Sequence, residues 1–147
     1  MKSYSFAEEP ETAKKQDRFR LTLRLFGGIS QTWTNVDIEN GEMRVVHAGK
    51  AGPVQQISDA DVNTILALIV ALDLLSLDEE SKKSSAADAT RLNMRIEYGQ
   101  LKLKFVSDNA GCPEPLIKFI LMVIDSEPVR ERVLSFRLTQ FLHELDE

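Results

Sequence analysis

Cysteine and histidine, which build many metal and nucleophilic sites, are scarce in this 147-residue sequence, with one cysteine and two histidines. The single cysteine, Cys112, excludes an internal disulfide and favours a reducing, cytoplasmic location. The histidines, His47 and His143, stand far apart, with no second cysteine or histidine at ligand spacing. We therefore expect no metal site and no cofactor.

Positive charge is also in deficit, because 18 Lys and Arg stand against 23 Asp and Glu, a net charge of -5. This balance argues against nucleic acid as the main partner, since binding phosphates needs an excess of Lys and Arg. The longest apolar run, residues 65–77, is interrupted by Asp73 and is too short to span a bilayer. The first 15 residues lack the apolar stretch of a signal peptide. We expect a soluble intracellular protein without a membrane partner.

The hydrophobic pattern divides the chain into three parts. Residues 1–17 are polar and are predicted to form a flexible N-terminal arm. Residues 18–126 combine alternating and helical patterns and are predicted to form an α+β domain. Residues 127–147 are predicted to form an amphipathic C-terminal helix, which Pro128 separates from the helix before it.

A glycine pair at the end of the first alternating run raises the question of a phosphate site. Apolar and polar residues alternate over 19–25, which predicts a half-buried strand, and Gly27-Gly28 follow it. The pattern after the pair is again a strand, with no helix N-terminus, third glycine or Lys-Ser/Thr, so a phosphate loop is excluded. A two-residue hairpin loop at the glycines would place Trp33 opposite Thr22.

Two further turns complete the predicted sheet. Asn40-Gly41 predicts a hairpin that pairs Ile38 with Met43, and Gly99-Gln100 predicts another that follows the strand over 91–98. The element order is βββ-α-ββ-αα, which indicates an α+β fold with an antiparallel sheet of about five strands and helices packed on one face.

Helix signals lie between and after these hairpins. Ser58 is a favourable N-cap for a helix over about 59–72. Its apolar stripe is wide, and Val70 and Leu75 extend it, so we expect this helix to be buried on more than one side or to face both the sheet and another helix.

The first candidate contact surface surrounds Trp33 on the outward side of the first hairpin. A large apolar side chain on a solvated face is costly unless something covers it, which suggests a protein contact. Its expected neighbours are Arg20, Arg24 and Val46. The alternative is that the chain's own termini cover Trp33, or that an arginine stacks on it.

The second candidate surface is basic and comprises Arg91, Arg95, Lys102 and Lys104. It would suit an acidic partner, although basic residues also prevent strand edges from aggregating. The predicted register places Arg95 opposite Lys104, a mildly unfavourable pair, and Glu97 opposite Lys102. A third candidate surface, for a homodimer, is the C-terminal helix, with Val133, Phe136 and Phe141 at helical spacing.

Parts of this pattern resemble the emfourin family of small bacterial inhibitors of thermolysin-like metallopeptidases. The resemblance covers residues 21–124 and rests on four features, namely the strand that ends in Gly27-Gly28-Ile29, the helix that opens after Ile57-Ser58-Asp59, the strand Arg91–Tyr98, and Pro113-Glu114-Pro115-Leu116 before a helix. The resemblance implies a protein inhibitor of a thermolysin-type metallopeptidase. The charged arm before Phe19, the long Asn40-Gly41 hairpin and the extra helix after Pro128 depart from the family's pattern.

The prediction for function is a non-catalytic protein-interaction or regulatory domain. No catalytic arrangement stands out, so we expect no enzyme. The emfourin-like inhibitor is the first alternative. A small enzyme that uses Cys112 is the second, since a Gly-Cys-Pro turn before a helix can lower the pKa of a thiol, although no neighbouring base is evident.

Overall fold

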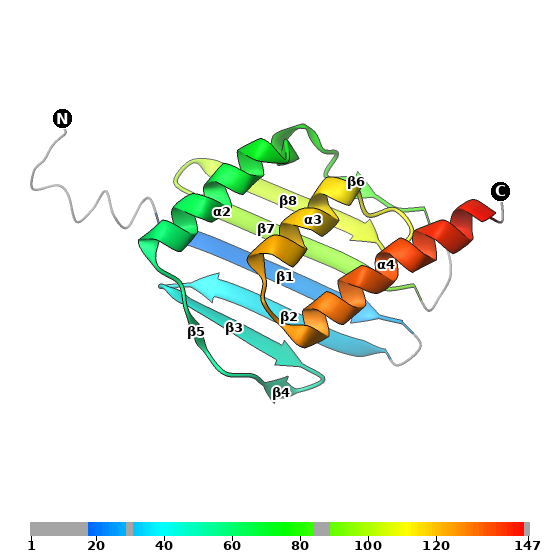
Figure 1. Ribbon diagram of the computed structural model, residues 1–147, viewed down its shortest axis with the longest axis horizontal. Coiled ribbons are helices and arrows are strands. Elements are labelled where there is room, and N and C mark those ends of the chain that lie inside the picture. The colour runs from blue at the N-terminus through cyan, green and yellow to red at the C-terminus, as the bar shows by residue number, and fades with distance from the viewer. Residues whose placement is uncertain (1–17, 29–30, 84–88, 146–147) are drawn as a thin grey trace, which may run out of the picture.

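Alternation of apolar and polar residues produces the mixed, mostly antiparallel sheet at the centre of this α+β fold (Figure 1). The computed structural model describes residues 18–28, 31–83 and 89–145. The strands are β1 (Phe19–Gly27), β2 (Thr32–Glu39), β3 (Glu42–His47), β4 (Lys50–Ala51), β5 (Gln55–Gln56), β6 (Glu80–Ser81), β7 (Arg91–Tyr98) and β8 (Leu101–Asp108). Their order is β4-β3-β2-β1-β7-β8-β6, and β5 also pairs with β3.

The expected count of about five strands was too low. The five long strands are the expected ones, and β4, β5 and β6 add two residues each. β6 runs parallel to β8, while the other pairings between described strands are antiparallel. A two-residue strand is too short to show alternation, and Glu80-Ser81 is polar, so the sequence pattern contains no signal for these edges.

Two tight turns produce the registers that the sequence predicts. Asn40 and Gly41 have φ angles of 57° and 77°, as a type I′ turn requires, and Ile38 lies opposite Met43. Gly99, with φ of 60°, begins the β7–β8 turn, and that register is also the predicted one. In both hairpins the turn chemistry is local, which is why sequence alone was sufficient.

The register of β1 with β2 differs from the prediction by four residues. Trp33 lies opposite Phe26 rather than Thr22. Gly27 belongs to β1 and β2 begins at Thr32, so the glycine pair alone does not connect the two strands. A shift by an even number of residues leaves every side chain on its expected face, so the apolar pattern could not distinguish the two registers.

Three α-helices of the described chain lie on one face of the sheet (Figure 1). They are α2 (Asp59–Ala71), α3 (Glu114–Val123) and α4 (Glu127–Leu145), and a 3-10 helix, η1 (Leu74–Ser76), follows α2. The cap of α2 is confirmed: the Ser58 hydroxyl accepts the Asp61 N–H at 3.1 Å, and the Asp61 carboxylate accepts the Ser58 N–H at 2.9 Å.

Of the two expectations for α2, burial on more than one side was wrong, whereas contact with both the sheet and a second helix, α3, is confirmed. Within this helix the buried side chains are Ile65 and Ile69, whereas Val70 is 71% exposed and Leu75, in η1, is 58% exposed. The helix lies in a single layer over the sheet, so one side of it is covered and apolar residues on the other side remain in solvent.

The C-terminal helix α4 packs into the same hydrophobic core as the rest of the domain. Its residues Val129, Val133 and Phe136 are fully buried in the cluster that the strands, α2 and α3 form. The predicted arm, residues 1–17, lies outside the described residues, as do residues 146–147. Within the described segments, no helix has both the length and the apolar character that crossing a bilayer requires.

Candidate functional site

The candidate site lies on the sheet face opposite the helices, here called the outer face, which no described helix covers (Figure 1). Along each strand its side chains alternate with those of the core. On the five long strands the apolar side chains of this face are Phe26, Trp33, Val46 and Val106, and the remainder are polar or charged.

Phe26 and Trp33 form a pair at one end of this face, here called the aromatic corner. Their ring centroids are 4.3 Å apart, and the ring planes are tilted by 33°. The Trp33 residue is nevertheless 51% exposed, so the contact with Phe26 covers only part of the indole. Sequence reasoning overlooked Phe26 because the predicted register placed Thr22 opposite Trp33 instead.

The two arginines predicted beside Trp33 have different positions. Arg24 lies opposite Asn35, diagonally adjacent to Trp33, whereas Arg20 lies six residues from Phe26 along β1, about 20 Å away. Arg20 was therefore wrongly predicted as a neighbour of Trp33. Val46 lies opposite Asn35 on the next strand and is the expected diagonal neighbour.

Both arginines are held by partners of this chain. The Arg24 guanidinium donates to the Asp37 carboxylate at 3.0 Å and to the Val36 carbonyl at 3.2 Å. Arg20 lies 3.4 Å from Glu39 and 3.9 Å from Glu97. These contacts balance charge along the outer face, and the Arg24–Asp37 pair is the one that lies next to the aromatic corner.

The predicted basic group is divided by the structure. Arg95 lies opposite Lys104 as expected, and within the described residues neither has an ion-pair partner. Lys102 lies opposite Glu97, but the ion pair of Glu97 is with Arg20.

Arg91 is distinct from the other basic residues. It is half-buried, lies opposite Phe26, and its Nη1 is 3.9 Å from the carboxylate of Asp108. Asp108 itself is fully buried and accepts the Gly111 N–H at 2.7 Å and the Lys83 N–H at 3.2 Å. Arg91 therefore belongs to the aromatic corner and its adjoining buried carboxylate rather than to a freely exposed basic face.

Arg132 supports the aromatic corner from the helix layer and was not identified from the sequence. Its guanidinium donates to the Thr32 carbonyl at 2.9 Å and to the Gly27 carbonyl at 2.8 Å. Partial burial lowers the pKa of Arg132, and the two carbonyls accept from its Nη1 and Nη2. These bonds join α4 to both strands of the first hairpin where the turn begins, and this long-range contact had no sequence signal.

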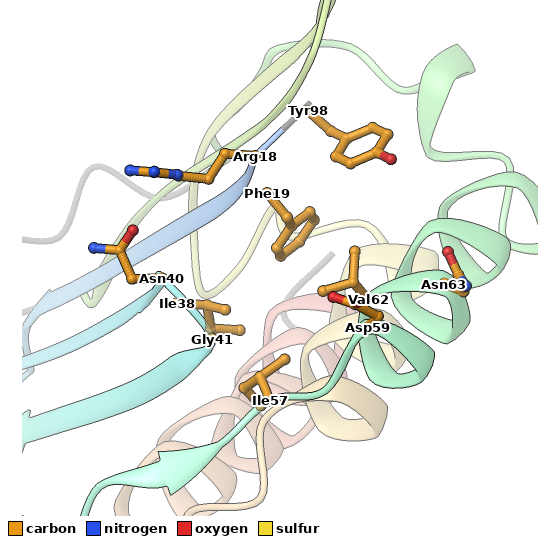
Figure 2. Close-up of a pocket in the computed structure, with 10 residues that line it drawn as sticks. All are labelled: Arg18, Phe19, Ile38, Asn40, Gly41, Ile57, Asp59, Val62, Asn63 and Tyr98. Carbon is orange, nitrogen blue, oxygen red and sulfur yellow. The ribbon is translucent and has the colours of Figure 1, made fainter. Parts of the chain in front are cut away.

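A hollow of about 490 Å³ lies at the other end of β1, between the sheet and the start of α2. Figure 2 shows Phe19 and Tyr98 from the sheet, and Ile57 and Val62 from around the start of the helix, bordering the same space. Asp59 is the single carboxylate of the described lining, which contains no histidine or cysteine. The described lining therefore offers no acid–base pair.

Cys112, the nucleophile of the alternative enzyme hypothesis, is buried within the core. Burial raises the pKa of its thiol to about 12, a hydrogen bond with Ser107 offsets part of that rise, and the charges of Glu114 and Asp108 add smaller increases. His47 lies opposite Thr34, and its Nδ1 is 2.7 Å from the Thr34 hydroxyl. In the described part of the chain, no three His, Cys, Asp or Glu residues are grouped so as to hold a metal ion.

The predicted dimer residues do not share one surface. Val133 and Phe136 have no exposed surface because they face the sheet, so their assignment to a dimer interface was wrong. Phe141 is 56% exposed. Helical spacing alone could not show which side of α4 faces inward.

Comparisons of this chain with family models, with curated proteins and with solved structures found no match.

Proposed function

We propose that this chain is a non-catalytic protein-binding domain that contacts its partner through the outer face, with the aromatic corner as the central contact. The observation that carries the proposal is the half-exposed Trp33, the chain's one tryptophan, on a sheet face without a covering helix in the described structure. A cytoplasmic location is part of the proposal, supported by the single buried thiol of Cys112.

The chemistry of the aromatic corner suits a protein contact. Tryptophan and arginine are among the residues that most often supply binding energy at protein interfaces. Arg24 lies diagonally across from Trp33, and Arg91 lies opposite Phe26, the ring that contacts Trp33. Because Arg24 is already held by Asp37, a partner would meet a preorganised surface and lose little side-chain entropy on binding.

The absence of an organised reactive group among the described residues supports a non-catalytic role. The thiol of Cys112 is buried with a raised pKa, which is the opposite of the change that activates a nucleophile. The acids of the outer face neutralise arginines, as in the pairs Arg20–Glu39 and Arg24–Asp37.

The test uses Trp33→Ala, with Val70→Ala as a matched control on the helix side, since Val70 is 71% exposed. From a native cell lysate, we expect immobilised wild type and Val70→Ala to capture the same protein, and Trp33→Ala to capture none of it. Circular dichroism should show that all three forms are equally folded. Mixing the purified partner with wild type should then shift the single-tryptophan emission to shorter wavelength as the indole is covered. Equal capture by all three forms, or an unchanged emission, would refute the proposal.

A second candidate function is inhibition of a thermolysin-type metallopeptidase. It is supported by the positions of the elements that carry the emfourin resemblance: β1 ends at Gly27, α2 follows the Ser58 cap, and α3 follows Pro113. Titration of a thermolysin-like enzyme with the full chain should abolish peptidase activity at stoichiometric inhibitor. Full activity in the presence of micromolar chain would exclude this function for that enzyme class.

A further inference from the structure

Helix α4 has two apolar stripes on opposite sides. The inner stripe, Val129, Val133 and Phe136, has no exposed surface. The outer stripe consists of Leu134, Leu138, Phe141 and Leu145, which are exposed by 40%, 59%, 56% and 65%. At 100° per residue the outer stripe lies within about 60° of arc, roughly opposite the inner one.

The spacing of the outer stripe is that of a helix–helix seam. Its members follow one another at intervals of four, three and four residues, the repeat by which two α-helices interlock their side chains. The stripe is also accessible, because the C-terminal turns of α4 extend beyond α3 (Figure 1). An apolar row of this length on a single helix is costly in water unless a second helix covers it.

We propose that the outer stripe of α4 pairs with the same stripe of a second copy of this chain, with the two helices antiparallel. A twofold axis midway between residues 139 and 140 then produces two kinds of layer. Leu138 packs on Phe141 of the second copy, and Leu134 packs on Leu145 of the second copy. Both layers share the same twofold axis, so a single antiparallel arrangement covers all four residues of the outer stripe.

Charge complementarity selects the second copy as the occupant and the antiparallel direction. Arg137 and Glu144 flank the same side of the stripe and are both exposed. In the antiparallel pair Arg137 lies beside Glu144 of the second copy, and symmetry repeats the contact. A parallel pair would place Arg137 beside Leu142 instead. Arg137 already bonds Glu114 through Nε and Nη2, which orients the guanidinium and leaves Nη1 available.

This interface is independent of the outer face, because α4 lies on the other side of the sheet (Figure 1). A dimer formed through α4 would present two aromatic corners to one partner or to two. The inference therefore extends the proposed function without depending on it, and failure of either leaves the other intact.

The first test measures the mass of the full chain by sedimentation equilibrium up to about 200 µM, a range that detects weak association. We expect the mass to rise from 16.6 kDa towards twice that value. Leu138→Glu should remain monomeric over the same range. Met122→Glu, at a 63% exposed position of α3, is the matched control and should dimerise as wild type does.

The second test exchanges the flanking charges. Arg137→Glu and Glu144→Arg should each weaken dimerisation at least tenfold by juxtaposing like charges, and the double exchange should restore it. Circular dichroism establishes that each variant is folded. A monomeric wild type, a Leu138→Glu variant that still dimerises, or a double exchange no better than the singles would overturn the proposal. Binding of the stripe to lipid vesicles or to an unrelated protein, with no self-association, would overturn it equally.

Discussion

Replacing Gly27 by alanine tests the close contact that sets the corner of the first hairpin. Gly27 has φ of +115°, and a Cβ added there would lie 2.6 Å from the Ala89 carbonyl oxygen and 3.4 Å from Thr90 Cα. Both neighbours are backbone atoms of the two residues that lead into β7, so relief requires the backbone to move. The substitution thus adds a strained backbone conformation and an overpacked contact.

The magnitude follows from separating these two effects. A non-glycine residue at such a φ costs about 1–3 kcal/mol, and overpacking adds about 1–3 kcal/mol. Gly49 provides the matched control, since its φ is +81° and a Cβ there would meet nothing within 4 Å. We therefore expect Gly49→Ala to lose only the backbone term and Gly27→Ala to lose about 1–3 kcal/mol more.

Urea unfolding followed by Trp33 fluorescence and by far-ultraviolet circular dichroism measures the difference. Trp33 reports on the hairpin beside Gly27, and circular dichroism reports on the whole fold. With a typical dependence of the unfolding free energy on urea concentration, the urea midpoints of Gly27→Ala and Gly49→Ala should differ by about 1 M. Equal midpoints for the two variants would refute the close-contact argument, because backbone strain alone would then account for both.

Two further predictions concern groups that only the folded structure places. Arg132→Met keeps most of the side-chain stem but removes the bonds to the Thr32 and Gly27 carbonyls, so it should lower the free energy of unfolding by about 2–4 kcal/mol. The control is Arg130→Met, because Arg130 is exposed on the same helix. Equal thermal unfolding midpoints for the two variants would contradict the role assigned to Arg132. Cys112 has a pKa of about 12 against a usual 9.0, so at pH 9 about a thousandth of the native protein carries a thiolate. Iodoacetamide should therefore modify the native protein far more slowly than the urea-unfolded chain, and native stability should fall as pH rises from 9 towards 12, because the unfolded thiol releases its proton first. Equal alkylation rates would show that the thiol is not buried.

The sequence alone determined the features that depend on neighbouring residues. Asn40 and Gly41 favour positive φ angles, so the turn and its register follow directly. The side chain of Ser58 caps α2 by bonding within its own first turn. Alternation placed Trp33 on the outer face, since side-chain direction depends only on parity within a strand.

The tertiary structure decided the features that depend on distant contacts. The β1–β2 register differs by four residues from the one that the sequence predicts. In the observed register Gly27 lies close to Ala89, and Arg132 donates a hydrogen bond to the Gly27 carbonyl. Parity is unchanged by that shift, so the hydrophobic pattern is equally consistent with both registers.

The same reasoning explains the error in α4. Its two opposite apolar stripes have the same helical period, so the sequence did not distinguish the buried Val133 and Phe136 from the exposed Leu138 and Phe141. Packing against the sheet determines which stripe is buried, because the inner stripe fills the core beneath α4 and the outer stripe is left facing solvent.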